Sequence, residues 1–106
     1  MIKPFREMAQ LDKLIHEPAR LAIMSALDSC SLAEFLLLQE MTGLTKGNLS
    51  SHLSKLERSL YVQIDKQFLR KKIPHTTIRI TKNGKAAIKL YWQQLDKIRE
   101  KTREWE

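Results

Sequence analysis

Residues 43–60, GLTKGNLSSHLSKLERSL, combine side chains that bind nucleic acid with side chains that build a protein core. Their leucines recur at intervals of four, three and four residues, which is the spacing of one face of an α-helix. The opposite face carries hydroxyls, an amide and cations, which hydrogen-bond base edges or bind phosphates. We therefore predict a DNA-reading helix over residues 45–59. Its contacts would come from Thr45, Lys46, Gly47, Asn48, Ser50, Ser51, Ser54, Lys55 and Arg58.

The short side chains on this face would let the helix body approach a DNA groove closely. Gly47 is costly in a first helical turn, but it removes bulk where the helix N-terminus would meet the DNA backbone. The alternative interpretation is the solvated face of an ordinary amphipathic helix. The short turn before the helix and the basic segment after it favour DNA.

A second cluster of cations lies between two segments in which apolar and polar residues alternate. Residues 61–68 and 75–81 both alternate in this way, which is typical of β-strands. They predict an antiparallel hairpin with a basic wing over residues 69–76, which would reach the DNA backbone or the minor groove. A solubilising loop that protects a sheet edge is the alternative. The predicted wing contacts are Arg70, Lys71, Lys72 and His75.

The positive charge is concentrated in this part of the chain. The length of 106 residues suits one domain over residues 1–106. The formal charge of +7 suits a polyanionic partner. Residues 43–75 hold seven Lys and Arg against two acids, whereas residues 1–42 hold four against six. The single cysteine excludes an intrachain disulfide, and we see neither a signal peptide nor an apolar run of membrane-spanning length. We expect a cytoplasmic protein without a membrane partner.

The sequence indicates no catalysis, metal or cofactor. His16, His52, His75 and Cys30 lie on different predicted elements and lack the spacing of metal ligands. We expect His52 to be a half-buried packing residue with a hydrogen bond, and Cys30 to be a small, partly buried thiol. Because no nucleophile–base pair or glycine-rich phosphate loop is recognisable, we predict that the protein is not an enzyme.

Two helices should precede the reading helix. Glu17 and Pro18 predict the start of the first, which should end near residue 28. Ser31 and Glu34 fit a capping box that opens the second. The residues of this second helix that should face inward are Leu32, Phe35, Leu36 and Met41.

The connection between the second and third helices predicts the fold. Gly43 can take the left-handed position after one helix, and Thr45 can cap the next, with Asn48 at its third position. Such a short connection is the tight turn of a helix-turn-helix. Thr81 should cap a last helix over residues 82–105. We predict a mainly α fold with a small β-hairpin (α+β), namely a winged helix-turn-helix with a three-helix core, a two-stranded wing and a long C-terminal dimerisation helix.

Two stretches resemble the winged-helix transcriptional regulators of the ArsR/MarR type. LIHEPARLAIMSAL is similar to the segment before their helix-turn-helix, and LTKGNLSSHLSKLERSLYV is similar to their recognition helix. The resemblance covers roughly residues 11–91 and implies sequence-specific DNA binding that regulates transcription. The cysteine pair of ArsR-type metal sensors is missing from residues 31–43. The glycine that usually precedes the wing is also missing, so Ser59 or Leu60 must take its turn.

Both ends of the chain carry apolar residues at helical spacing. The C-terminal ones are spaced like a heptad seam, and we expect no intrachain surface to cover them beyond Leu95. We therefore predict a homodimer through the segment 1–15 and the helix 82–105, as the resemblance also implies. The alternative is a C-terminal helix that folds back on its own domain. The predicted interface residues are Ile2, Phe5, Met8, Ile88, Tyr91, Leu95, Ile98, Thr102 and Trp105.

The leading functional hypothesis is a homodimeric regulator that binds double-stranded DNA, with the reading helix in the major groove. A winged-helix protein-interaction module is one alternative, although such modules usually carry an acidic or apolar face in place of this one. An effector-sensing regulator with a ligand at the dimer interface is another. The sequence does not determine the operator, the target genes, the effector, or whether the protein represses or activates.

Overall fold

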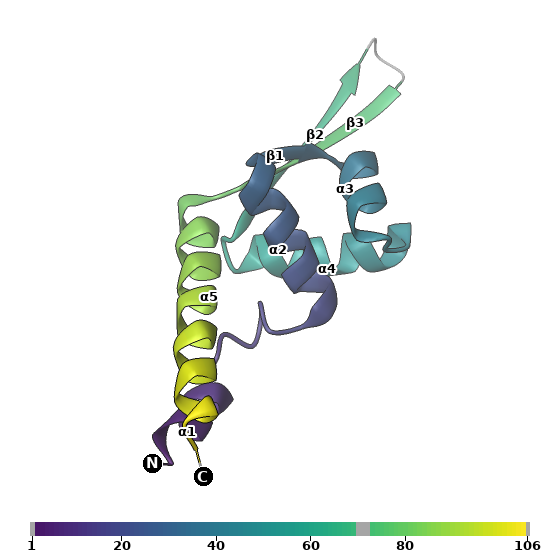
Figure 1. Cartoon of the computed structure of the whole chain (residues 1–106). Coiled ribbons are helices and arrows are strands. Elements are labelled where there is room, and N and C mark those ends of the chain that lie inside the picture. The colour runs from purple at the N-terminus through teal and green to yellow at the C-terminus, as the bar shows by residue number, and fades with distance from the viewer. Residues whose placement is uncertain (1, 70–72, 106) are drawn as a thin grey trace.

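A computed structural model describes residues 2–69 and 73–105 of the chain. Three helices pack together, a hairpin projects from them, and a long last helix runs away from this body with the first helix against its far end (Figure 1). Within the described residues, the elements are α1 (Lys3–Ala9), α2 (Pro18–Cys30), β1 (Leu32–Glu34), α3 (Phe35–Thr42), α4 (Lys46–Arg58), β2 (Val62–Leu69), β3 (Ile73–Ile80) and α5 (Lys82–Arg103).

Side-chain caps start three of the helices where the sequence predicts them. The carboxylate of Glu17 accepts a hydrogen bond from the Arg20 amide at 2.8 Å, and Pro18 follows it as the first residue of α2. The Thr45 hydroxyl accepts from the Asn48 amide at 3.1 Å, and Thr81 caps α5 in the same way. Each cap satisfies an amide that has no partner inside its own helix.

The junction between α2 and α3 differs from the prediction. α2 continues to Cys30, and Ser31 ends it with a φ of 67° instead of opening the next helix. The predicted capping box is therefore wrong. Residues 32–34 form the short strand β1, which pairs with β3, so that the sheet has three strands in the order β1-β3-β2. Pairing with β3 satisfies the backbone of this segment, and α3 begins only at Phe35.

The buried face of α3 also differs from the prediction. Leu38 is fully buried, and Phe35 packs against the core. Leu36 is 74% exposed, and Leu32 and Met41 are exposed as well, so their predicted inward orientation is wrong. Residues 35, 38 and 42 lie on one face of the helix and turn to the body, whereas residues 36 and 41 lie off that face and residue 32 belongs to β1.

Strands β2 and β3 form the predicted antiparallel hairpin. At its root, Val62 pairs with Ile80 and both side chains are buried. Near its tip, Phe68 pairs with Pro74 and is 71% exposed, so the wing extends past the core into solvent (Figure 1). The predicted tip contacts Arg70, Lys71 and Lys72 lie outside the described residues.

The leucines of α4 anchor it to the body. Leu49, Leu53 and Leu56 are buried in one core with residues of α2, the sheet and α5. Leu60, the last of the predicted stripe, is instead exposed. Its φ of 63° lies in the left-handed region that favours glycine. Leu60 therefore makes the turn into the wing that, without a glycine, we expect of Ser59 or Leu60.

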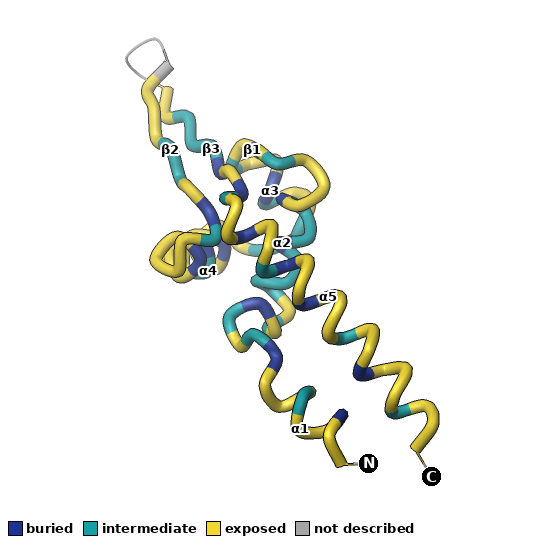
Figure 2. Tube along the Cα trace, turned by 90° about the vertical axis from the view of Figure 1, so that its left-hand side faces the viewer, coloured by how far each residue is buried: buried dark blue, intermediate teal, exposed yellow. Residues whose placement is uncertain are grey.

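The far end of α5 is covered by the chain itself. Ile98 is 1% exposed because α1 packs across this end of α5, and buried positions recur along the helix (Figure 2). The expectation that no intrachain surface remains beyond Leu95 is therefore wrong. Ile88 and Tyr91 are also buried within the chain, so these three side chains have no surface to offer a second copy. For the other predicted interface residues, dimerisation stays a prediction.

Aromatic and ionic contacts hold α1 against the end of α5 and the residues that follow it. The rings of Phe5 and Trp105 meet edge to face, with centroids 5.0 Å apart. The Lys101 ammonium lies 3.3 Å from the Glu7 carboxylate. Both aromatic rings stay partly exposed, so this contact leaves an apolar surface at the end of the molecule.

A hydrogen bond between Asp12 and Tyr61 joins the segment after α1 to the start of the wing. The Tyr61 hydroxyl donates to Asp12 Oδ2 at 2.6 Å, while Oδ1 accepts from the amides of Leu14 and Ile15. Burial, together with this hydrogen bond and the charge of Asp12, raises the pKa of Tyr61 to about 12.

Replacing Tyr61 by phenylalanine should lower the free energy of unfolding by about 1 to 2 kcal/mol near neutral pH. The pKa of Tyr61 lies above its ordinary value of 10, so the contribution is present below pH 10 and is lost as the pH rises towards 12. Urea unfolding of both proteins at neutral pH and at about pH 11 would measure this. A stability difference that is equal at the two pH values would contradict the assignment.

Candidate nucleic-acid interface

The predicted reading face of α4 points away from the body. The helix is anchored by Leu49, Leu53 and Leu56, and the residues on its other side are solvent-exposed. The chain itself therefore does not cover the surface that would meet DNA. The exposed residues are Thr45, Lys46, Gly47, Asn48, Ser50, Ser51, Ser54, Lys55 and Arg58.

Some polar groups on this face already have partners within the helix. The Ser54 hydroxyl donates to the Ser50 carbonyl at 3.0 Å, and Arg58 Nε donates to the Ser54 carbonyl at 3.4 Å. The Thr45 oxygen accepts the capping bond. The Ser54 oxygen can still accept from a ligand, and the terminal guanidinium nitrogens of Arg58 can still donate.

Packing does not require a glycine at position 47. A Cβ atom added to Gly47 would meet no atom within 4 Å, and its φ is not in the left-handed region. A glycine costs about 0.5 to 1 kcal/mol in a helix relative to alanine. Its presence in the first turn of α4 fits a surface that another molecule approaches closely.

His52, on the inner flank of α4, fixes this helix to the start of α2. Its Nδ1 lies 3.1 Å from a terminal nitrogen of Arg20. Since arginine only donates, Nδ1 accepts and the proton is on Nε2, which lies 3.8 Å from the Glu17 carboxylate. With its side chain 18% exposed, His52 is the half-buried, hydrogen-bonded packing residue that the sequence predicts.

Glu17 is held in its charged form at this contact. Burial alone would raise its pKa, but the hydrogen bond from the Arg20 amide, together with the nearby His52 ring and Arg20 guanidinium, lowers it below the ordinary value. Arg20 Nε also donates to the Leu14 carbonyl. This polar contact complements the leucine core in setting the orientation of α4.

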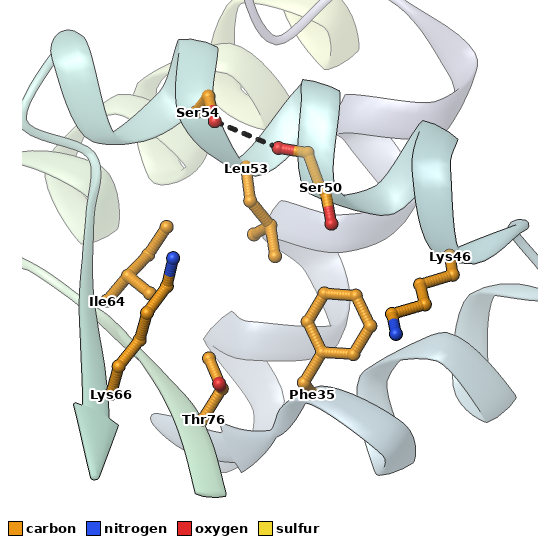
Figure 3. A pocket seen from close by; sticks show the side chains of 8 residues that line it. All are labelled: Phe35, Lys46, Ser50, Leu53, Ser54, Ile64, Lys66 and Thr76. Carbon is orange, nitrogen blue, oxygen red and sulfur yellow. Dashed lines mark hydrogen bonds between the residues drawn. The ribbon is translucent and has the colours of Figure 1, made fainter. Parts of the chain in front are cut away.

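A groove runs between α4 and the wing (Figure 3). Its volume is about 260 Å³, and two lysines border it from opposite sides. Lys66 and Thr76, on the wing strands, are not among the predicted site residues. The period of two in β2 indicates that Lys66 shares a face with Ile64, but only the packing shows that this face turns to α4. This α4–wing groove is lined by Phe35, Lys46, Ser50, Leu53, Ser54, Ile64, Lys66 and Thr76.

His75 is the one predicted wing contact whose position the described residues include. Its ring is partly buried, and Nε2 lies 4.0 Å from a carboxylate oxygen of Glu34 at the end of β1. Pro74 beside it is exposed and lies opposite Phe68 in the hairpin. His75 therefore lies where the wing passes β1, next to an acid that the sequence does not place there.

Other side-chain chemistry is sparse in the part of the chain that the structure describes. No group of three or more His, Cys, Asp or Glu in it is arranged to hold a metal ion. None of its helices is long and apolar enough to cross a membrane. Cys30 is exposed at the end of α2, with its thiol donating to the Ala26 carbonyl, so its predicted partial burial is wrong. The cause is the extension of α2 past residue 28, which puts Cys30 on the outer face of its last turn.

Comparison with known proteins places this fold among DNA-binding regulators. A family model described as a winged helix DNA-binding domain matches residues 19–99. An uncharacterized protein of Methanocaldococcus jannaschii is 35% identical over 79 residues, which cover 74% of this chain and 85% of that protein.

Solved structures resemble the chain over nearly its whole length. A transcriptional regulator homologue from Pyrococcus horikoshii OT3 has a TM-score of 0.83 at 30% identity, covering 92% of this chain and 97% of that one. A mutant of MarR from E. coli has a TM-score of 0.69 at 13% identity, covering 92% of this chain and 74% of that one. The second likeness concerns the fold alone.

Proposed function

Because this chain belongs to the winged helix DNA-binding domain family and is a winged-helix transcriptional regulator, we propose that it binds double-stranded DNA as a homodimer. In this proposal α4 enters the major groove and reads sequence, while the wing contacts the backbone or the adjacent minor groove. Residues 1–106 act as one DNA-binding domain whose two ends provide the dimer contacts.

The observation that carries the proposal is the exposed face of α4. Three buried leucines hold α4 on one side, and eight of its exposed residues lie on the other side together with the capping residue Thr45. Glu57 is the only acid of the helix. Lys55 and Arg58 would bind phosphates, and Asn48 and the serines are short enough to reach base edges. In the wing, we assign further phosphate contacts to Arg70, Lys71, Lys72 and His75.

An exposed apolar surface along α1 and α5 supports the dimer. A hollow of about 380 Å³ lies between the two helices and is partly lined by Met8, Trp92 and Leu95. Phe5 and Trp105 extend this apolar surface to the end of the molecule. Two-fold pairing through it would hold two copies of α4 on one side of the DNA. Successive major grooves of a palindrome lie about 34–36 Å apart, which sets the spacing that the dimer must provide.

Selection of bound sequences from random duplex DNA, at two salt concentrations, would test the reading helix. We expect a palindromic consensus with half-sites one helical turn apart, and weaker binding to every sequence at the higher salt concentration because counterions are released. Uniform recovery of sequences at both concentrations would show non-specific binding and would contradict the proposal.

Sedimentation at micromolar concentration would test the dimer separately. We expect a species of twice the 12.4 kDa chain mass. Trp92→Glu should shift it towards the monomer, because the carboxylate would be buried without a partner. Gln93→Glu adds the same single negative charge to an exposed position of α5 and serves as the matched control. A species of 12.4 kDa alone for the unmodified chain would remove the dimer from the proposal.

A further inference from the structure

The α4–wing groove separates the two elements that the proposed function assigns to neighbouring grooves of DNA. In B-DNA one sugar–phosphate strand runs between the major groove and the adjacent minor groove. A protein with a helix in the first and a hairpin at the second must leave room for that strand. We propose that the α4–wing groove holds this strand and that Lys46 and Lys66 bind its phosphates from opposite sides. The inference rests on the proposed function.

The charges that border the groove suit a phosphate backbone. Lys46 begins α4 and Lys66 lies in β2, and both side chains border the same space (Figure 3). Both residues are exposed, and within residues 2–69 and 73–105 neither forms an ion pair with an acid. Two ammonium groups at one groove repel each other, and an anion between them offsets that repulsion.

Hydroxyl groups add donors at the same place. Ser50 lines the groove from α4, one turn after Lys46, and Thr76 lines it from β3. Thr76 lies directly opposite Lys66 in the hairpin, so the two side chains share one face of the sheet. Serine and threonine hydroxyls are common donors to phosphate oxygens in protein–DNA contacts.

The floor of the groove is apolar. It is formed by Phe35, Leu53 and Ile64, which come from α3, α4 and β2. The C–H groups of deoxyribose can lie against such a floor while the phosphates turn to the lysines at the rim. Because the two walls are the elements that would grip DNA, the arrangement favours a nucleic-acid strand over a free small anion.

The salt dependence of DNA binding by Lys66→Gln would test this inference. For each duplex, we compare the slope of the logarithm of the binding constant against the logarithm of the salt concentration. The variant's slope should be smaller in magnitude by about 0.9, because one phosphate contact is lost. Binding should weaken to a similar extent for the selected sequence and for unrelated sequences, because a backbone contact carries no base information. Lys46→Gln should act in the same way, and the double variant should lose about 1.8.

Two matched variants serve as controls. Lys66→Arg keeps the charge and should keep the slope. Lys89→Gln removes an exposed charge from α5, away from the groove, and should leave the slope unchanged. If the unmodified protein binds DNA and Lys66→Gln binds with unchanged affinity and slope, the inference is wrong while the proposed function stands. If the unmodified protein binds no duplex, the proposed function itself is wrong.

A titration with inorganic phosphate, monitored by NMR, would test the alternative that the groove binds a free anion. A groove that serves a free anion would show saturable phosphate binding that Lys66→Gln abolishes, while DNA affinity stays the same. That result would overturn the inference. We expect the reverse, with weak phosphate binding and a clear loss in the DNA measurement.

Discussion

Replacing Ser51 by glutamate should reduce the affinity for DNA by about 100-fold or more for every sequence. Ser51 is exposed on the face of α4 opposite its buried leucines. A carboxylate there would lie against the phosphates and acceptor-rich base edges, and like-charge contacts across an interface cost several kcal/mol. At 1.4 kcal/mol for each factor of ten, such a cost gives the expected loss.

The variant should keep its fold, so that the loss can be assigned to the interface. Glutamate is a better helix former than serine, and nothing of the core touches this face. Gln93→Glu is the matched control, because it adds the same charge to an exposed position of α5. Fluorescence anisotropy with a labelled duplex would compare the three proteins, with circular dichroism to monitor the helices. A Ser51→Glu protein that binds as tightly as the unmodified one would show that α4 does not meet DNA.

Replacing Gly84 by alanine should destabilise the protein by about 1 to 3 kcal/mol, although alanine is the better helix former. A Cβ at this position would overlap the Tyr61 carbonyl oxygen and lie 2.9 Å from Cγ1 of Ile80. The carbonyl cannot move freely, since it accepts a hydrogen bond from the Thr81 amide at 3.1 Å. The first turn of α5 therefore passes the start of the wing too closely for any side chain.

Gly47→Ala gives the opposite expectation and is the control. No atom lies within 4 Å of the added Cβ, so the gain in helix propensity should stabilise the protein by about 0.5 to 1 kcal/mol. For a domain of about 100 residues, each kcal/mol shifts the melting temperature by about 4–8 °C. Melting curves should therefore move in opposite directions for the two variants. A Gly84→Ala protein that melts at or above the unmodified temperature would contradict the close packing of α5 on Tyr61.

Local signals in the sequence correctly predicted much of the fold. Glu17, Thr45 and Thr81 each cap a helix within three residues, so the interaction needs no distant partner. The leucine spacing of α4 and the alternation of β2 and β3 depend only on helical and strand periods. These same periods place the polar residues of α4 on one face, which is why the candidate site could be predicted on that helix.

The sites that sequence analysis missed depend on contacts between distant segments. Lys66 and Thr76 border the α4–wing groove only because the hairpin leans against α4, and Glu34 meets His75 only because β1 joins the sheet. No local pattern marks such positions. The correction to the predicted dimer seam has the same origin, since α1 covers Ile98 from the other end of the chain.

The sequence alone therefore determined the helices with strong caps, the hairpin, and the polar face of α4, because each depends on residues within a few positions of one another. Tertiary structure alone decided the strand β1, the inward face of α3, the burial of Ile88, Tyr91 and Ile98, and the groove between α4 and the wing. The physical reason is that backbone pairing and side-chain burial are set by segments far apart in the chain. A heptad-like spacing shows that one side of α5 must be covered, but it does not show what covers it.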